Sequence, residues 1–476
     1  MTRLHSPSPI FNRIMVLARD MAIGALALGI GLAIGQILAG GQATWPITLI
    51  GLTAYALVIF AYPLAGLLFW IVSAPFSRFV YLDIILGRGI PDLTLTRICT
   101  GLLIMVALAQ LAIGKRHGSR PILLDGVVLA TLVGIGAALP AAQDGLKSAI
   151  TAFGDSYLVP GIIYILARFL VRERQQAEHV CTAFIILGTI LTTVAVQEQL
   201  SGSVLFVYSE RSWYYTKDIH RLAGLLGSPA FFATLITMAG GFTVYRFTRA
   251  KTPNMRLLYG LLAAYTVIGV YFTYNRAGWL SLAINMVIMA IAWPSFRRLF
   301  ATATVAGLLA AILSWSSLQH SAVVTQRLAA RGPVEYRLEV WSKAAAILSH
   351  SPIFGLGYGN FGTVYLRYDP NWTRANILLP APHNSFLEVL FNEGLIGGVP
   401  YMAMFIVIGL GIVRFYRRAK DKTDGDAGLI LAFALAVLAY VVQAMVVDMA
   451  AAYYVNMVFM LAVGALFGWQ ESTENP

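Results

Sequence analysis

A histidine stands just ahead of an expected helix in the segment APHNSFLEVLFNEGLIGG, residues 381–398. Ser385 and Glu388 have the S-x-x-E spacing of a capping box, so a helix is expected to begin at about Ser385. The positive end of a helix dipole disfavours an imidazolium and favours a nearby anion. This position would suit His383 as a neutral general base beside a negatively charged ligand, with Asn384 and Glu388 as candidate helpers. The alternative is a histidine that only braces the loop through hydrogen bonds.

Arginines are frequent in segments that the charge pattern assigns to the outer face, where the positive-inside rule predicts few. They are Arg211, Arg221, Arg276, Arg327, Arg331, Arg337, Arg367 and Arg374. Arg276 lies in YNRAGWLSL, between two apolar stretches with almost no loop, and Arg221 directly precedes another apolar stretch. An arginine at the centre of a membrane helix costs about 2.5–3.5 kcal/mol, and less near its end, so each needs a partner or water. Because guanidinium binds phosphate in a bidentate way, this pair is predicted to hold phosphate groups; snorkelling to lipid headgroups is the alternative.

Three alternating glycines occur in GLGYGNFGTVY, residues 355–365. Such a backbone can turn tightly and present N–H groups to an anion, which makes Gly357 and Gly359 candidate helpers; a plain turn is the alternative. No strand precedes the glycines, so a dinucleotide-binding fingerprint is excluded. The sequence contains no HExxH, no GxSxG and no histidine pair with metal-ligand spacing. The sequence therefore predicts no metal and no cofactor, and arginines would have to neutralise any phosphate charge.

The elements that position these residues are membrane helices. Of the 476 residues, 58% are hydrophobic and only 12% are charged, with a mean hydropathy of +0.73, which predicts an all-α polytopic membrane protein. The net charge of +12 is explained by basic residues in cytoplasmic loops, and nucleic-acid binding is excluded because no basic stripe interleaves with aromatic residues. Cys99 and Cys181 fall in or beside apolar stretches, so no disulfide is expected.

About 12–14 transmembrane helices are predicted. The apolar stretches are 20–40, 46–60, 63–76, 97–114, 122–140, 157–171, 179–197, 224–245, 256–273, 277–293, 299–316, 397–414, 427–447 and 450–468. When 46–76 is a hairpin broken near Pro63, every basic cluster and both termini lie in the cytoplasm. Three regions follow. They are transmembrane helices with short loops in 1–316, an extracytoplasmic catalytic loop in 317–396, and the last transmembrane helices with a cytoplasmic tail in 397–476.

The long loop is predicted to contain an amphipathic helix that lies over the membrane. Pro333 suits a first helical position, and apolar residues follow at steps of three and four. The apolar positions are Val334, Leu338, Trp341, Ala345 and Leu348.

In this order the motifs resemble the O-antigen ligase and polymerase family of bacterial membrane glycosyltransferases. The resemblance rests on Arg221 with GSP after it, YNRAGWLSL, RLEVWSKAAAILSHSPIFGLGYGNF and HNSFLEVLFNEGLIGG, and it covers roughly residues 210–415. The first half of the chain agrees only in topology. Members usually carry Asn-Pro-Asn after the first arginine, whereas this chain reads GSPAFF, so the role of residues 226–230 is open.

The resemblance implies a metal-independent inverting transferase of the GT-C type in the bacterial inner membrane. Such enzymes move a glycan from undecaprenyl pyrophosphate to lipid A core (ligases), to another lipid-linked repeat (polymerases) or, in some relatives, to protein. Carried onto this chain, Arg221 and Arg276 would hold the pyrophosphate, His383 would activate the acceptor hydroxyl, and Arg337 would be a helper. A transporter or flippase for the same lipid is the competing class, although it should show interrupted helices in two matching halves.

Overall fold

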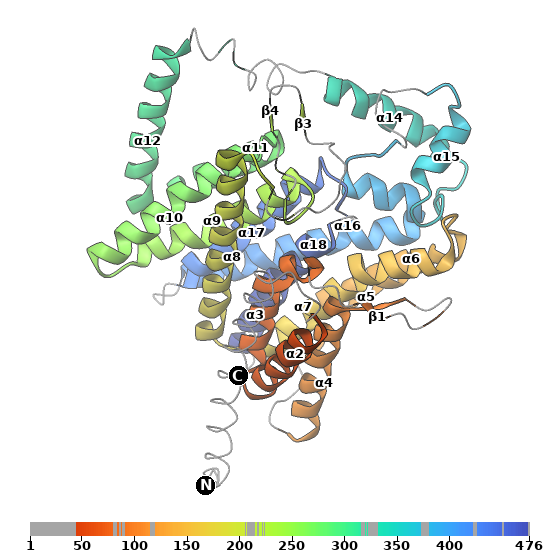
Figure 1. Ribbon diagram of the computed structural model, residues 1–476, viewed down its shortest axis with the longest axis horizontal. Helices are drawn as coiled ribbons and strands as arrows, with labels where there is room; N and C mark the ends of the chain where they lie inside the picture. The colour runs from red at the N-terminus through yellow and green to blue at the C-terminus, as the bar shows by residue number, and fades with distance from the viewer. Residues whose placement is uncertain are drawn as a thin grey trace.

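The computed structural model describes residues 44–474, apart from 80–82, 85–86, 88–90, 115–119, 205, 207–214, 217–218, 221, 223, 316–318, 320, 322–331, 373–379, 422–425 and 450–451. Within these residues the fold is helical, which confirms the predicted class (Figure 1). Two short antiparallel ladders are the described exceptions. β1 (Asp83–Ile84) pairs with β2 (Leu93–Thr94), and β3 (Tyr215–Thr216) pairs with β4 (Ile219–His220).

The helices run through the whole described chain. In the first half they are α2 (Thr44–Ala61), α3 (Pro63–Ser73), α4 (Leu95–Ala112), α5 (Leu123–Gly136), α6 (Leu146–Phe153), α7 (Val159–Leu170), α8 (Arg174–Ser201) and α9 (Pro229–Arg249). In the second half they are α10 (Pro253–Phe272), α11 (Arg276–Ala292), α12 (Pro294–Leu313), α14 (Gly332–Leu348), α15 (Phe361–Tyr368), α16 (Ser385–Lys420), α17 (Asp426–Ala444) and α18 (Tyr453–Glu474). Proline begins α3, α9, α10 and α12, where its missing N–H costs nothing.

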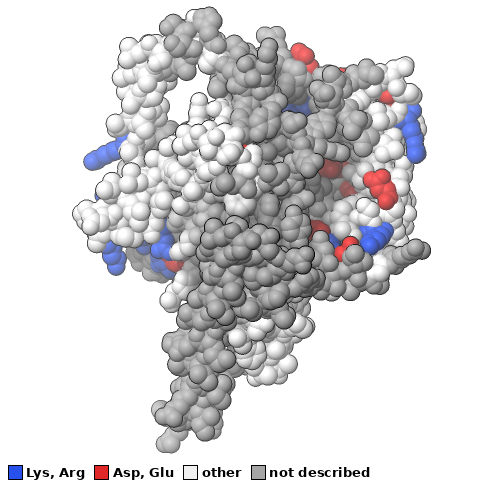
Figure 2. Space-filling model, in the orientation of Figure 1, with Lys and Arg blue, Asp and Glu red and all other residues white. Residues whose placement is uncertain are grey.

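Nine of the described helical segments are long and apolar enough to cross a membrane, and three shorter ones are apolar. Figure 2 shows correspondingly few charged side chains among the described residues on one face of the molecule. The protein is therefore a multi-pass membrane protein. The expected span 20–40 lies outside the described residues, and the span expected at 299–316 corresponds to α12, which is not among the nine.

One predicted span begins much earlier than expected. The stretch predicted at 157–171 is part of a continuous helical segment, Leu146–Leu170, that joins α6 and α7 through a π-helical turn at Gly154–Leu158. Residues 146–156, which were expected in a loop, are therefore helical. Lys147 and Asp155 interrupt the apolar pattern, which is why the sequence predicts a shorter span. Asp155 forms a bidentate ion pair with Arg97.

The hairpin predicted at 46–76 is confirmed. α2 ends at Ala61, α3 begins at Pro63, and the ring of Tyr55 contacts the rings of Phe69 and Trp70 on the returning helix. The two backbones approach so closely that a Cβ on Gly66 would clash with Ile59. This contact explains why a small residue stands one turn into α3.

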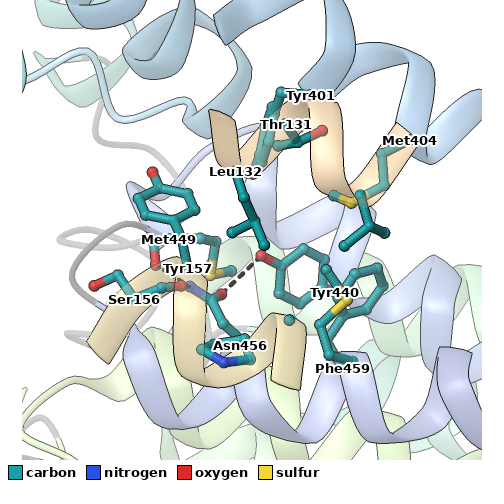
Figure 3. A pocket seen from close by; sticks show the side chains of 14 residues that line it. Thr131, Leu132, Ser156, Tyr157, Tyr401, Met404, Tyr440, Met449, Asn456 and Phe459 are labelled. Carbon is teal, nitrogen blue, oxygen red and sulfur yellow. Dashed lines mark hydrogen bonds between the residues drawn. The ribbon is translucent and has the colours of Figure 1, made fainter. Parts of the chain in front are cut away.

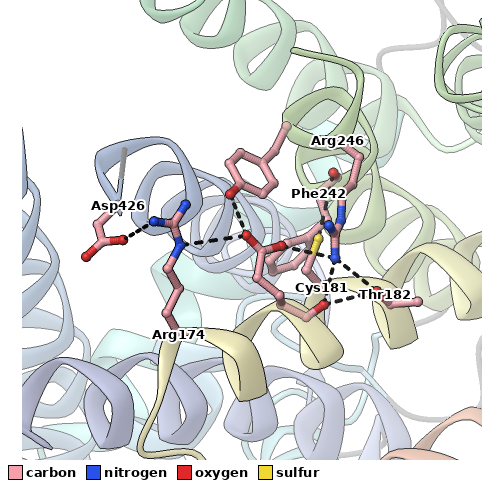
Figure 4. Close-up of polar contacts among 8 residues, drawn as sticks. Arg174, Cys181, Thr182, Phe242, Arg246 and Asp426 are labelled. Carbon is pink, nitrogen blue, oxygen red and sulfur yellow. Dashed lines mark hydrogen bonds and ion pairs between the residues drawn. The ribbon is translucent and has the colours of Figure 1, made fainter. Parts of the chain in front are cut away.

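Basic clusters that are far apart in the sequence meet at one end of the bundle. Arg174 of α8 lies 3.1 Å from Asp426 of α17, and Arg246 of α9 lies 3.0 Å from Glu178 of α8 (Figure 4). Tyr245 also donates a hydrogen bond to Glu178 at 2.7 Å. The basic residues around Arg174 and Arg246 therefore share an end, although which side of the membrane this end faces stays a prediction.

α16 is broken near its start, and the glycine-rich loop covers the break. Gly394 has non-helical backbone angles (φ 62°, ψ −156°). On one side of the break, the N–H groups of Leu356 and Gly357 donate to the carbonyls of Phe391 and Asn392 at 2.9 and 2.8 Å. On the other side, the N–H groups of residues 395 and 396 donate to the carbonyls of residues 352 and 353 at 2.9 and 3.2 Å. The loop thus supplies backbone partners that the broken helix cannot supply itself.

Replacing Gly355 with alanine is expected to destabilise the protein by roughly 1–3 kcal/mol. Gly355 has φ +73°, and an added Cβ would lie 2.4 Å from the backbone nitrogen of Gly394. Gly359 offers a matched control because its φ is +71° but its Cβ would meet open space. Thermal unfolding in detergent should show a clearly larger loss for Gly355→Ala than for Gly359→Ala, and equal losses would contradict the close approach.

α14 and α15 form a second hydrophobic core on the first turns of α16 (Figure 1). The helix predicted after Pro333 is confirmed as α14, but the predicted apolar stripe packs only in part. The buried side chains of α14 are Tyr336, Val340, Ala344 and Ile347. Trp341 and Leu348 of the predicted stripe are partly buried against this core, whereas Val334 and Leu338 are exposed. Both faces of this helix carry apolar residues, so spacing alone could not select the face that packs.

Candidate active site

The helix that follows His383 begins at the predicted residue but with a different cap. Asn384 is the N-cap of α16, and its side-chain oxygen accepts hydrogen bonds from the N–H groups of Phe386 and Leu387 at 3.0 and 3.1 Å. Ser385 does not cap the helix, contrary to the predicted capping box. Its hydroxyl instead donates to the carbonyl of Val447 at 2.7 Å and accepts from the N–H of Met449 at 2.8 Å. The serine therefore ties the start of α16 to the chain after α17.

The backbone at His383 is held in an uncommon conformation. Its φ is 48°, in the left-handed region, which costs a residue with a Cβ about 1–2 kcal/mol. α14 fixes the two residues before it. Trp341 donates to the carbonyl of Pro382 at 2.7 Å, and the Tyr336 hydroxyl both donates to the carbonyl of Ala381 and accepts from its N–H. The Tyr336 ring also lies 5.7 Å from the imidazole, so α14 orients the histidine from two directions.

Asp448 is the partner of His383, and sequence reasoning missed it. The carboxylate Oδ2 lies 3.2 Å from the imidazole Nδ1, and Oδ1 accepts from the N–H of Asn384 at 3.0 Å. A neutral imidazole that donates from Nδ1 to this carboxylate keeps the lone pair of Nε2 available for a proton. The side chain of His383 is 44% exposed while that of Asp448 is 17% exposed, so the histidine faces outward and the aspartate braces it from behind. The signal that could have found it is an aspartate between two apolar spans. A carboxylate near the membrane costs free energy, so such a residue is a candidate for a functional role.

Arg276 is presented by a turn of the same kind. It is the first residue of α11, and Asn275 caps that helix by accepting from the N–H of Gly278 at 2.6 Å. Tyr274, like His383, lies just before a capping asparagine and has φ 48°. Two helix N-termini with the same local design thus present Arg276 and His383. Each contributes the partial positive charge of a helix end.

Arg337 and Arg276 belong to different helices but lie near enough for their charges to interact. Burial, and then the positive charge of Arg276, lower the pKa of the Arg337 guanidinium, while Asp448 partly offsets this effect. Arg337 also donates to the carbonyl of Val446 at 3.1 Å. Two neighbouring guanidinium groups repel each other unless an anion lies near both. This pairing suits a doubly charged group such as pyrophosphate, while Arg221, the other predicted member, lies outside the described residues.

These groups meet at residues 443–449, which run from the end of α17 toward α18. Gln443 donates to the side chain of Asn275 at 3.4 Å, next to Arg276. The carbonyl of Val446 accepts a hydrogen bond from Arg337. The carboxylate of Asp448 contacts the imidazole of His383 and accepts from the N–H of Asn384. One short segment therefore contacts three of the predicted residues, Arg337, His383 and Asn384, and the neighbour of a fourth, Arg276.

The remaining predicted helpers, Gly357, Gly359 and Glu388, differ in their surroundings. The N–H of Gly357 is used by the α16 carbonyl of Asn392, so at Gly357 the loop behaves as a turn rather than as an anion cradle. Gly359 has φ +71° and open space where a Cβ would project. Glu388 lies one turn into α16, and its Oε2 atom is buried with no hydrogen-bond partner among the described residues. The role of these three residues toward a substrate stays a prediction.

A small cavity with a mixed polar and apolar lining lies behind the site. Its volume is about 30 Å³, and its lining includes Ser156, Tyr157, Tyr401, Tyr440, Met449 and Asn456 (Figure 3). Tyr440 donates to Asn456 at 2.8 Å, and Asn456 in turn donates to the carbonyls of Ser156 and Met449. The space has room for one or two water molecules and none for a sugar. The hydrogen bond from Asn456 fixes Met449, which follows Asp448.

Residues 261–402 match a protein-family model described as O-antigen ligase. No match was found among proteins of curated function. The matched residues run from the middle of α10 into α16 and include Arg276, Arg337 and His383 but not Asp448. The resemblance inferred from the motifs is confirmed for this stretch, and it implies a transferase of the O-antigen ligase or polymerase type. Residues 261–402 of this multi-pass membrane protein are thus similar to the O-antigen ligase family.

Proposed function

We propose that the protein is a metal-independent, inverting glycosyltransferase. It moves a glycan from undecaprenyl pyrophosphate to an acceptor hydroxyl, with lipid A core as the acceptor of a ligase. The observation that carries the proposal is the convergence of the Arg276–Arg337 pair and the His383–Asp448 pair on residues 443–449. The description of the matched family supports the ligase reading, and a polymerase that extends lipid-linked repeats is the alternative.

The proposed reaction is a single displacement at the anomeric carbon. The acceptor oxygen attacks this carbon as Nε2 of His383 takes its proton, which contributes about 10²–10⁴-fold in rate. The bond between the carbon and the pyrophosphate oxygen breaks on the opposite side, so the configuration inverts. The leaving pyrophosphate gains negative charge, which preorganised guanidinium groups stabilise more strongly than they stabilise the ground state. Arg276 and Arg337 would supply this charge, together with Arg221 as the resemblance implies.

The proposed topology places the site on the periplasmic face of the inner membrane with both termini in the cytoplasm. The shared end of the basic clusters supports this orientation, since such clusters face the cytoplasm. A donor would then enter from the bilayer and an acceptor sugar from water. Cysteine labelling from each side of intact cells would test the orientation.

The deciding experiment uses the purified protein in nanodiscs with an undecaprenyl-pyrophosphate-linked repeat unit and no other acceptor. A ladder of products on a gel would identify a polymerase. A single shifted product that forms only after lipid A core is added would identify a ligase. Inertness toward both acceptors, combined with movement of the lipid across vesicles, would refute a transferase and support the transporter.

Asp448→Asn is expected to lower turnover by roughly 10²–10⁴-fold, the range that a general base contributes. The amide cannot accept at both atoms, so the imidazole loses its fixed tautomer while Asn384 keeps its cap on α16. Single-turnover rates and donor affinity should be measured together. A change in affinity with an unchanged single-turnover rate would contradict the orienting role.

A further inference from the structure

The membrane span of α16 has one face of exposed apolar side chains. After the break at Gly394, exposed residues recur at steps of four, seven, four and three. They are Leu395, Val399, Ile406, Leu410 and Val413. These steps place them along one side of the helix. In a span of a multi-pass protein, such a stripe faces lipid.

The length of this stripe fixes the edge of the hydrocarbon. From Leu395 to Val413 the helix rises about 27 Å at 1.5 Å per residue, which is close to the thickness of about 30 Å of a hydrocarbon core. Arg414, Arg417 and Arg418 follow immediately and mark the headgroup level at that end. Leu395 therefore lies at the opposite edge of the hydrocarbon, on the side of His383.

Two apolar residues of the long loop lie beside this edge. Ile353 is 53% exposed and Phe354 is 69% exposed, and neither is among the residues that form the second hydrophobic core. The carbonyl of Ile353 accepts from the N–H of Ile396, and that of Pro352 accepts from the N–H of Leu395. These hydrogen bonds place the two loop residues next to the top of the lipid-facing stripe.

The neighbouring helix extends the same surface. A Cβ on Gly134 of α5 would lie 2.3 Å from the carbonyl oxygen of Ile396, so α5 and α16 touch at this level. On α5, Leu129 and Val133 are exposed and four residues apart, on one side of the helix. Two membrane spans with exposed apolar residues therefore meet at the level of Ile396, next to the loop that carries Ile353 and Phe354.

We propose that residues 352–354 form a membrane-inserted tip. They belong to the loop that the charge pattern assigns to water, but Ile353 and Phe354 enter the edge of the hydrocarbon on the His383 side, and lipid acyl chains cover them. Lipid is favoured over a protein partner because the tip is hydrogen-bonded to Leu395 and Ile396, where the lipid-facing stripe begins, and carries no charge. Burial of an apolar side chain in lipid is favourable, and phenylalanine is large enough to anchor the tip.

The tip would hold the catalytic loop at a fixed depth. The hydrogen bonds across the break in α16 join the tip to both sides of Gly394. The same loop packs on α14, which orients His383. The distance of the reacting groups from the bilayer would thus follow from the depth of residues 352–354.

The test uses single cysteines that carry an environment-sensitive fluorophore. Both native cysteines are buried, so the wild-type protein should take up little label. Ile353→Cys and Phe354→Cys are labelled after reconstitution into vesicles. Tyr368→Cys is the matched control, because Tyr368 is 53% exposed on the same unit but stands between Arg367 and Asp369. Emission is then compared with a nitroxide on the lipid acyl chain and with aqueous iodide as quenchers.

The labels at 353 and 354 should emit at shorter wavelength than the label at 368, with several-fold stronger quenching by the acyl-chain nitroxide and weaker quenching by iodide. Quenching by iodide equal to that at 368 would overturn the proposal and place the tip in water. Protection from both quenchers would overturn it too, because protein would then cover the tip. None of these readouts depends on glycosyl transfer, so the proposed function and the tip can fail separately.

Discussion

Arg276→Ala is expected to lower glycan transfer by at least about 10³-fold while the protein stays folded. Preorganised positive groups at a leaving oxygen or phosphate contribute 10²–10⁵-fold in other enzymes, and this arginine is one of two described guanidinium groups that meet at the site. The fold should survive because Asn275 still caps α11 and alanine is an excellent helix former at its first position. Transfer rates in nanodiscs and thermal unfolding in detergent measure the two effects separately.

Arg256→Ala is the control for this variant. Arg256 lies in the first turn of α10, whereas Arg276, the first residue of α11, follows the last turn of α10. The two arginines therefore lie near opposite ends of α10. The control should keep the wild-type rate. A folded Arg276→Ala protein with wild-type activity would remove the pyrophosphate role from this residue, and loss of activity in the control alone would show that charge at the other end matters more.

His383→Ala is expected to keep donor binding and lose roughly 10²–10⁴-fold in turnover, because the acceptor hydroxyl no longer has a positioned base. Alanine at φ 48° adds backbone strain, so His383→Asn is the sharper variant. Asparagine tolerates the left-handed region and keeps a polar side chain beside Asp448 without offering a base of suitable strength. Binding of a non-hydrolysable lipid-linked donor and single-turnover transfer should be measured on both variants.

The two variants should agree with each other. Loss of turnover in His383→Ala with normal turnover in His383→Asn would point to a bracing histidine, the alternative that the sequence left open. Weaker donor binding with normal turnover at saturation would assign the imidazole to the substrate rather than to proton transfer.

The membrane class and the hairpin at Pro63 could be predicted because each depends on a local pattern. Apolar length sets the number of spans, and proline ends one helix and begins the next. The start of α16 was predicted for a partly wrong reason. Asn384 and Ser385 are adjacent at the start of the helix and both are good capping residues. The choice between them depends on Val447 and Met449, whose backbone groups hydrogen-bond the serine hydroxyl. No local pattern records a contact across more than 60 residues.

The same limit explains Asp448. It stands in a segment that the apolar pattern reduces to a two-residue turn, and its function appears only when α17 returns beside α16. The side of α14 that packs against the core could not be predicted for a different reason. Its helical period was clear, but Val334 and Leu338 on one side are as apolar as Val340 and Ile347 on the other. Burial there is decided by α15 and α16, which cover only one of the two sides.

The position of residues 443–449 limits how this protein can be recombined. The segment that matches the O-antigen ligase family ends at 402, more than forty residues before Asp448. A chimera that exchanged residues 261–402 between two such proteins would inherit the histidine and the arginines from one parent and the carboxylate brace from the other. Its activity would then depend on whether the two parents hold residues 443–449 in the same register. The stretch that matches the family and the set of residues that meet at the site therefore have different bounds in this chain.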